Sequence, residues 1–529
     1  MRRKNYIWML LAGLLLIGTS CEDFLDQAPE SKENADVLFT KPNSVNAYLL
    51  GLYNQWRDCH KNKTVFLLGT DEVKVGGVQY RDDQNKRGIE MYSDELSTTN
   101  GNALDLWKTR YQIISGATLA IEKIREANLD DETMNRYLAE ACALRGACYF
   151  ELTQFFGEIP LNNAEVVAEY GAKRQPLDLV YQKIEEDLLE AASFLPTHSD
   201  TTYVDKQRFG KAFAYAMLGK TFLYAPANSG IRDYAKAGEF FQKVYEDPFF
   251  NKTGASKFGV IFDETGQSDG TLDWEKEMIY AFRFSNVRGD NSGSEWDFGS
   301  RAVSVMTPIE ATAYFAGFDH SMPTAYCYSM KEDGGLWEKG DYRKDLSIRY
   351  DFKYNGKMPE LIGYCYGDEL DPHIKKYEDY RTEEQGLNTW HSGKHMPYIR
   401  FADIVLCYAE CMYKTGKQAE AIKMVNEKIR ARAFQSKPVG SNMWPTSLGE
   451  EEFMERMLDE RMRELAFEGW RRLDLLRMGK VKELVPQRNT WFLEKGITAV
   501  DESRFLFPIP LDELRMNSDM TDADQNPGY

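Results

Sequence analysis

Hydrophobic residues recur at helical spacing along most of the chain. In the stretch PNSVNAYLLGLYNQW they fall at Val45, Leu49 and Leu52, with Pro42 at the start. Apolar residues that return every three or four positions form one face of an amphipathic helix. The same spacing predicts further helices over about 102–127, 131–156, 176–194, 208–227, 232–247, 400–415, 417–434 and 450–478. Most of the chain is therefore predicted to be helical.

Several of these helices come in pairs. The stretches YAMLGKTFLYAPANSGIRDYAKAGEFFQKVYEDP and ADIVLCYAECMYKTGKQAEAIKMVNEKIRAR place small residues, such as Gly219 and Ala409, where two helices would meet. Small residues let antiparallel helices approach closely, which is the plan of tetratricopeptide repeats. We expect such pairs over about 131–247 and 400–434, forming a stiff scaffold with a face that can hold a partner.

Helical spacing disappears between about residues 249 and 398. Glycine and aromatic residues rise together there, and only short strand-like runs such as EMIYAFRF remain. A second irregular stretch covers residues 71–102. Long loops on a rigid scaffold are where binding sites usually lie. The predicted fold is thus mainly α: tetratricopeptide-like helix pairs with a loop-rich, irregular ligand-binding insertion and few short strands.

The N-terminus has the three parts of a secretory signal. A cationic start is followed by an apolar run, Ile7 to Ile17, and by small residues before Cys21. The apolar run is shorter than the roughly 20 residues of a membrane-spanning helix. A cut just before Cys21 resembles bacterial lipoprotein processing, although Gly18 stands where that pattern usually has leucine. We predict a signal peptide over 1–20, a lipid anchor on Cys21, a tether over 21–40 and one domain over 41–529. The alternative is an ordinary signal after which Cys21 pairs or stays free.

Composition narrows the class of partner. The chain has 529 residues, a formal net charge of -18 and 13% aromatic residues. This is the composition of a packed globular protein, and its negative charge repels phosphate backbones, so nucleic acid is not expected to bind. Apart from Cys21 there are seven cysteines, an odd number without zinc spacing, so at least one is unpaired.

Catalytic motifs find no support. Acidic pairs such as Asp71 and Glu72 are adjacent in sequence, and adjacent residues seldom face one substrate. His391 and His395 have the spacing of helical zinc ligands, but Gly393 and Pro397 argue against a helix there. No GxSxG, P-loop or GxGxxG motif occurs. We predict no catalysis, no cofactor and no metal. A calcium ion that shapes a loop is possible, but the sequence does not support one. The charges of ERMRELAFEGWRRLDLLRMG are interpreted as a buried ion-pair network.

Three C-terminal stretches are similar to successive signatures of the SusD-like (SusD/RagB, starch-binding outer-membrane lipoprotein) family. They are PYIRFADIVLCYAECMYKTGKQAEAIKMVNEKIRARA, ERMRELAFEGWRRLDLLRMGKV and FLFPIPLDELRMNSDMTDADQNPGY, and TDEVKV and FFGEIPL resemble weaker landmarks upstream. The resemblance spans essentially the whole mature chain. It implies a non-catalytic, lipid-anchored protein at the cell surface of a Bacteroidetes-type bacterium, and Glu22 and Asp23 resemble the outward address of such lipoproteins.

The resemblance also implies a role and partners. Family members capture oligosaccharide and deliver it to a SusC-like TonB-dependent outer-membrane transporter, which their helical side faces. Two alternatives stay open: peptide capture by the same fold, and a purely structural subunit of the transporter complex.

Loop aromatics supply the candidate binding residues. A sugar ring has an apolar C–H face and an equator of hydroxyls, so it suits aromatic rings flanked by hydrogen-bonding side chains. Trp107 in LWKTRY is instead assigned to the core, because it lies at helical spacing with Tyr111. Each loop aromatic could equally be a packing residue. The predicted ligand contacts are Tyr80, Arg81, Asp82, Tyr92, Asn100, Trp296, Phe318, His320, Trp337 and Trp390.

Overall fold

The computed structural model describes most of the chain from residue 38 onward. The signal 1–20, Cys21, most of the tether over 21–40, and Trp390 lie outside the described residues. The described part is 38–529 without 62, 128–130, 163–170, 201–202, 204–207, 252–257, 263–271, 286, 288, 300–308, 311–316, 351–352, 355–363, 366–367, 370–371, 380–391 and 435–441.

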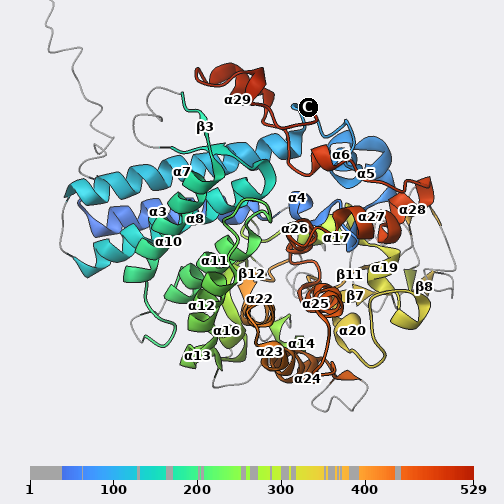
Figure 1. Cartoon of the computed structure of the whole chain (residues 1–529). Coiled ribbons are helices and arrows are strands. Elements are labelled where there is room, and N and C mark those ends of the chain that lie inside the picture. Colours follow the sequence, from blue (N-terminus) through green and yellow to red (C-terminus); the bar gives the residue numbers. More distant parts are fainter. Residues whose placement is uncertain are drawn as a thin grey trace, which may run out of the picture.

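Long helices lie side by side in the N-terminal half, at the left of Figure 1. Helix α8 is flanked by α7 and α10, and α3 packs against α7 and α8. The side chain of Asp131 starts α8 by accepting hydrogen bonds from two backbone N–H groups, and Gly157, with φ 73°, ends it. Both faces of α8 are buried over most of its length, which makes it the central helix of this layer. The bounds are α3 (Pro42–Cys59), α7 (Gly101–Ala127), α8 (Glu132–Phe156) and α10 (Leu177–Phe194).

The helix stack continues through the predicted pairs. Each of α10, α11, α12, α22 and α23 packs against the next, although the loop-rich region separates α12 from α22 in sequence. A Cβ atom at Gly219 would lie 2.5 Å from the ring of Phe241, so the small residue does allow the close approach of α11 and α12. The tetratricopeptide-like prediction is confirmed. The bounds are α11 (Lys211–Tyr224), α12 (Tyr234–Tyr245), α22 (Phe401–Lys414) and α23 (Gln418–Val425), which continues through the π-helical turn η4 (Asn426–Arg430) into α24 (Ala431–Ala433).

The helix predicted over 450–478 is wrong in one respect, because the chain breaks between α25 (Glu450–Leu465) and α26 (Arg471–Arg477). Phe467 and Gly469 have φ values of 65° and 94°, which an α-helix does not allow. The carbonyl groups freed by the break accept hydrogen bonds from Lys376 and Tyr377 of the loop-rich region. Tertiary contacts therefore override the helical periodicity.

Short strands and helices make up the loop-rich part, and its residues 321–350 lie at the right of Figure 1. The paired strands are antiparallel, among them β1 (Val73–Val75) with β6 (Ser321–Pro323) and β4 (Met278–Phe282) with β12 (Met396–Arg400). The stretch 71–102, predicted as irregular, contains two helices, and the Asp83 side chain caps the second one. These are α5 (Gly77–Asp82) and α6 (Gln84–Met91).

The remaining described elements are short. The strands pair as β2 (Ile159–Pro160) with β3 (Arg174–Gln175), β5 (Ile309–Glu310) with β8 (Lys353–Tyr354), β7 (Ile348–Arg349) with β11 (His373–Ile374), and β9 (Tyr364–Cys365) with β10 (Asp368–Glu369). The helices are α4 (Thr64–Leu67), α13 (Pro248–Asn251), α14 (Phe258–Ile261), α16 (Leu272–Glu277), α17 (Ser294–Phe298), α19 (Ala325–Tyr328), α20 (Arg343–Ser347), α27 (Val481–Arg488), α28 (Thr490–Lys495) and α29 (Leu511–Met516), with 3-10 turns η2 (Lys331–Asp333), η6 (Glu502–Arg504) and η7 (Asp522–Asp524).

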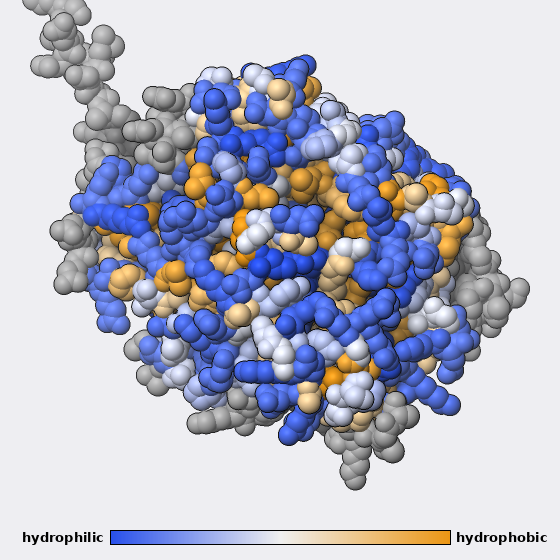
Figure 2. Space-filling view, in the orientation of Figure 1, coloured by the Kyte–Doolittle hydropathy of each residue, from blue (hydrophilic) through white to orange (hydrophobic). Residues whose placement is uncertain are grey.

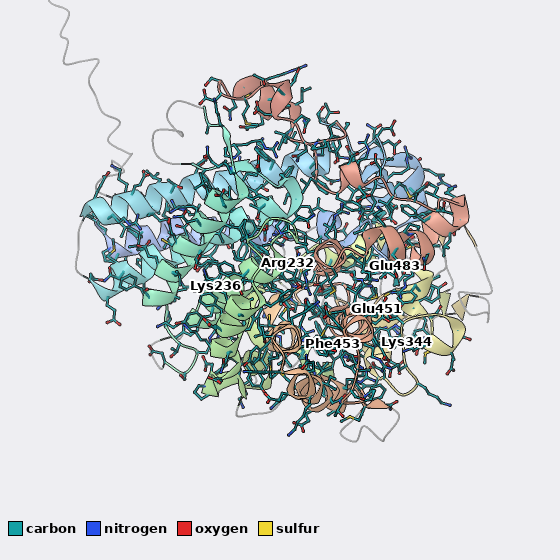
Figure 3. The ribbon with its side chains drawn as sticks, in the orientation of Figure 1. Arg232, Lys236, Lys344, Glu451, Phe453 and Glu483 are labelled. Carbon is teal, nitrogen blue, oxygen red and sulfur yellow. The ribbon has the colours of Figure 1, made fainter. Side chains whose placement is uncertain are left out.

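One hydrophobic core joins the helical and loop-rich parts. Trp56 of α3 is fully buried, and its ring contacts Phe213 of α11, Tyr280 of β4 and Tyr398 of β12. Phe453, labelled in Figure 3, stacks on Tyr413 with ring centroids 3.8 Å apart and so joins α25 to α22. No helix among the described residues combines the length and the apolar character needed to cross a membrane.

The predicted ion-pair network around α25 and α26 is confirmed. Burial alone would raise the pKa of Glu464, but the guanidinium groups of Arg432, Arg400 and Arg343 outweigh this effect and lower it to about 2. Asp71, at the start of the first loop stretch, receives two hydrogen bonds of 2.7 Å from Arg471. The network therefore ties α25 and α26 to the loops that they support.

Candidate functional site

The pairing of β1 with β6 brings the two predicted binding stretches together. Val73 lies opposite Pro323, and Val75 lies opposite Ser321. A Cβ atom at Gly76 would be 1.8 Å from the carbonyl oxygen of Asp319, so the two backbones can approach this closely only with glycine at position 76. Gly76, the residue before α5, therefore lies against Asp319 and His320, although about 240 residues separate them in sequence.

Tyr80 has a fixed position in this junction. Its ring stacks on the indole of Trp491, with centroids 3.9 Å apart and planes 16° from parallel. The indole is itself buried, and its Nε1–H donates a 2.7 Å hydrogen bond to the carbonyl of Val75. Arg87 donates to the carbonyl groups of Tyr80 and Arg81. The half-buried Tyr80 ring is thus held by α28 beneath it and by α6 beside it, a contact pattern that fixes an aromatic ring.

Polar groups lie on the other side of the junction. His320 Nδ1 is 2.8 Å from Asp297 Oδ1, and the His320 side chain is 20% exposed. Phe318 is half-buried, whereas Arg81 and Asp82 are exposed. We call Tyr80, Arg81, Asp82, Phe318 and His320 the junction patch. Its two halves, one on α5 and one just before β6, supply two aromatic rings, a cation, a carboxylate and an imidazole on either side of the contact between Gly76 and Asp319.

Three predicted ligand residues are corrected by their burial. Trp337 is fully buried and its Nε1–H donates to the carbonyl of Cys327. Tyr92 is 2% exposed, ends α6 in the left-handed region and donates from its hydroxyl to the carbonyl of Gly69. Asn100 is 1% exposed, and its side-chain oxygen accepts hydrogen bonds from two backbone N–H groups at the start of α7. Packing and capping occupy all three side chains, so we no longer assign them to ligand binding.

Two further predictions concern tryptophans of the loop-rich region. Trp296 lies in α17, the helix that also carries Asp297, but its side chain is outside the described part. Trp390 is wholly outside it. Trp491, which does contribute to the junction, was missed because it follows an ordinary helical stretch near the C-terminus. Nothing in its spacing indicates the distant loop on which it packs.

Two buried carboxyl groups beneath the patch have raised pKa values. Burial raises the pKa of Glu90 to about 7. Hydrogen bonds from the backbone N–H of Gly69 and the side-chain amide of Asn489 lower this pKa and offset part of the effect. Burial likewise raises the pKa of Glu72 to about 8, although the nearby guanidinium of Arg471 opposes the effect. Glu72 precedes β1 and Glu90 lies on α6, so the two groups stand on the segments before and after α5.

No metal centre is formed by the residues that the structure describes. Among them, no group of three or more histidine, cysteine, aspartate or glutamate side chains is placed to hold an ion. The cysteines described in detail are free, and Cys407 and Cys411 are buried against neighbouring helices. His320 of the patch and His373 beside it each face one carboxylate, with His373 Nε2 2.6 Å from Asp319 Oδ1.

A separate groove lies between α3, α7 and α29 and has a volume of about 1000 Å³. Trp107 is 3% exposed and packs on Phe156, which confirms its assignment to the core. It nevertheless forms part of the wall of this groove. Figure 2 shows hydrophobic surface below the projecting α29, on a face that is otherwise mostly hydrophilic.

Comparisons with known proteins cover nearly the whole chain. The family described as "Starch-binding associating with outer membrane" matches residues 23–223, and the "SusD family" matches residues 277–529. The SusD-like protein P25 of Formosa agariphila is 23% identical over 548 residues, covering 96% of this chain and 97% of that protein.

Solved structures share the fold. A SusD homolog from Bacteroides thetaiotaomicron has a TM-score of 0.74 at 24% identity, with 94% of this chain and 98% of that chain covered. Surface glycan-binding protein A from the same species, solved in complex with laminarihexaose, has a TM-score of 0.70 at 19% identity, with 92% and 99% covered. With successive family matches along the sequence and the helix-pair architecture in place, this chain belongs to the SusD/RagB family.

Proposed function

We propose that this protein is a cell-surface lipoprotein that captures oligosaccharide at the junction patch and delivers it, uncleaved, to a TonB-dependent outer-membrane transporter. Family membership supports the proposal, as do the outer-membrane description of the N-terminal match and the laminarihexaose complex of a protein with this fold. The observation that carries it is the pairing of the two loop stretches through β1 and β6, with the stacked ring of Tyr80 on α5, the helix that follows β1. Anchoring through Cys21 follows from the lipoprotein-like N-terminus.

The junction patch suits a neutral, hydroxyl-rich ligand. The stack on Trp491 immobilises Tyr80 before any ligand arrives, so binding does not have to order this ring. Arg81 and Asp82 extend from the same short helix and supply a donor and an acceptor beside the ring. An aromatic contact contributes about 0.5–1.5 kcal/mol beyond the area that it buries. Several such contacts give reversible binding, which a protein that must release its cargo requires.

A pair of tyrosine variants tests the site. Tyr80→Ala should weaken retention in native gels that contain the polysaccharide bound by the wild-type protein, and should lower its affinity in calorimetry about tenfold. Tyr245→Ala is the matched control, because Tyr245 is also half-buried and stacked, on Phe401, but lies in the helix stack on α12. Equal affinities for the two variants would refute the assignment of the patch.

The same samples test the class of cargo and the absence of cleavage. Release of reducing ends from the bound polysaccharide would contradict a non-catalytic role. Native mass spectrometry of the protein after incubation with a peptide digest and with oligosaccharides separates the two cargo classes. Retention of peptides alone would overturn the choice of glycan.

A further inference from the structure

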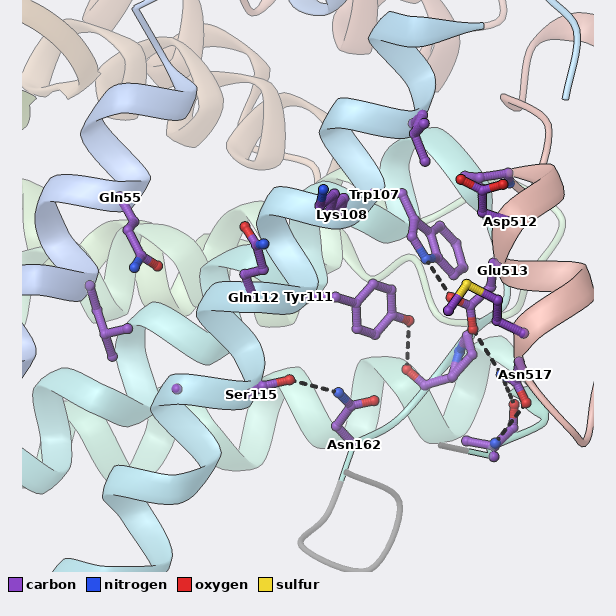
Figure 4. A pocket seen from close by; sticks show the side chains of 18 of the residues that line it. Gln55, Trp107, Lys108, Tyr111, Gln112, Ser115, Asn162, Asp512, Glu513 and Asn517 are labelled. Atoms are coloured by element: carbon purple, nitrogen blue, oxygen red, sulfur yellow. Dashed lines mark hydrogen bonds between the residues drawn. The ribbon is translucent and has the colours of Figure 1, made fainter. Parts of the chain in front are cut away.

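The groove between α3, α7 and α29 has the dimensions of a ligand site. Its volume of about 1000 Å³ lies at the upper end of the roughly 300–1,000 Å³ found for small-molecule pockets. Figure 4 shows α3 on one side, α7 along the middle and α29 on the other side. Each of these elements contributes several side chains to the lining, and none belongs to the junction patch.

Three aromatic rings of the groove are held by their polar ends. The hydroxyl of Tyr48 donates to the carbonyl of Gly116 over 3.1 Å, and that of Tyr111 donates to the carbonyl of Pro160 over 2.8 Å. The indole N–H of Trp107 donates to Glu513 over 3.2 Å. Because the protein itself satisfies these polar atoms, what the rings present to the groove is their carbon surface. The half-buried rings of Tyr48 and Tyr111 can therefore stack against the C–H face of a sugar, whereas the buried Trp107 packs against Tyr111 and supports it.

Hydrogen-bonding side chains on the rim are left for a ligand. Gln55 on α3, Lys108 and Gln112 on α7, and Asp512 on α29 are exposed, and none has a hydrogen bond or ion pair with the residues that the structure describes. Figure 4 shows their amide, ammonium and carboxylate groups on different walls of the groove. Donors and acceptors distributed around an aromatic floor match the equatorial hydroxyls of a saccharide.

Hydrogen bonds to other parts of the chain hold α29, the third wall of the groove. The amide of Asn517 exchanges two hydrogen bonds, of 3.0 and 2.9 Å, with the backbone of Ala172. The backbone N–H of Leu511 donates to the carbonyl of Thr98 over 3.0 Å. These contacts hold α29 at both ends. A preformed groove spends little binding free energy on ordering.

We propose that this groove is a second oligosaccharide-binding site of the protein. The inference rests on the proposed glycan capture and extends it from one binding site to two. An extended peptide is less suited, because the helical walls use their backbone groups internally and offer no free edge for strand addition. An amphipathic helix is also less suited, because it needs a row of large aliphatic contacts. The large aliphatic side chains of the lining are Leu52, Leu104 and Met516, and Leu52 itself is buried.

Filling the groove tests the proposal. Gly51 of α3 lines it, and a Cβ atom at this position meets nothing within 4 Å, so Gly51→Trp can begin its side chain in open space and add bulk to the groove. Asn54→Trp is the matched control, since Asn54 is exposed on the same helix and does not line the groove. Gln112→Ala removes a rim amide without adding bulk. Circular dichroism and melting temperature establish that each variant is folded.

The assay is calorimetry with the full mature chain. Starch, laminarin, xylan, mannan and pectin are screened in native gels, and the hexasaccharide of the retained polysaccharide is the titrant. We expect two hexasaccharides per wild-type or Asn54→Trp protein and one per Gly51→Trp protein. Tyr80→Ala should leave binding at the groove unchanged. Gln112→Ala should lower the affinity of the groove for the hexasaccharide about tenfold.

The outcomes separate this inference from the proposed function. One hexasaccharide per protein, with an affinity that Gly51→Trp leaves unchanged, overturns the groove site and leaves glycan capture intact. Retention of no polysaccharide overturns both. If a tryptic peptide digest displaces the groove hexasaccharide from the wild-type protein and fails to bind Gly51→Trp, that result would assign the groove to peptides and also overturn the inference.

Discussion

The ion-pair network allows a prediction with a calculable size. Glu464 on α25 is fully buried and receives hydrogen bonds from Arg343 at 2.9 Å and Arg400 at 3.1 Å, and it also contacts Arg432. The substitution Glu464→Gln keeps the shape of the side chain but removes its charge. Arg343, Arg400 and Arg432 then lose one carboxylate partner, and the new side-chain N–H group points at cations. Both changes destabilise the fold.

The lowered pKa sets the magnitude. A pKa that falls from 4.5 in the unfolded chain to about 2 in the fold corresponds to about 3 kcal/mol at pH 7, because each pKa unit is worth about 1.4 kcal/mol. Since the folded pKa is depressed, this stability is present above pH 4.5 and is lost as the pH falls through about 2. We expect Glu464→Gln to lose about 3 kcal/mol in urea unfolding at pH 7 and much less near pH 3.

A control on the same helix separates the effect of burial from that of the Glu-to-Gln change itself. Glu455 is exposed on α25, so Glu455→Gln should change the free energy of unfolding by less than about 0.5 kcal/mol. Unchanged stability of Glu464→Gln at pH 7, or a loss of glycan binding in a fully stable variant, would refute the structural interpretation of this network.

Three further predictions test other parts of the argument. Burial raises the pKa of Glu72 to about 8, so the stability linked to this group is present below pH 4.5 and is lost as the pH rises through about 8. Glu72→Gln should therefore raise the melting temperature more at pH 8.5 than at pH 5. Equal shifts at the two pH values would contradict this prediction. Gly76→Val should separate β1 from β6, cost about 1–3 kcal/mol in urea unfolding and weaken glycan binding, whereas Gly51→Ala should cost nothing. Cys21→Ser should release the protein from the membrane fraction and abolish labelling by palmitate, and a protein that stays lipid-labelled would refute the anchor.

Periodicity predicted the helices well because their faces pack on local neighbours. The expected ends of α7, α8 and α10 lie within a residue of those observed. The break between α25 and α26 could not be predicted, because Lys376 and Tyr377 stabilise it from a distant loop.

The candidate site was predictable only in part. Tyr80 and Trp337 occur in equally irregular, glycine-rich stretches, yet one is half-buried at the junction and the other is fully buried. Local sequence does not distinguish them, since exposure depends on which distant element covers each ring. The contribution of Trp491 and the groove beside α29 depend on the same kind of long-range contact, and for that reason neither was predicted.

The pairing of β1 with β6 has a consequence for how the protein matures. Joining segments so far apart in sequence requires closure of a long stretch of chain, whose entropy cost delays such contacts in folding. A newly exported chain can form its helix pairs from local contacts well before this junction closes. Closure of the contact between Gly76 and Asp319 would therefore come late in refolding, after the helical signal in circular dichroism has returned.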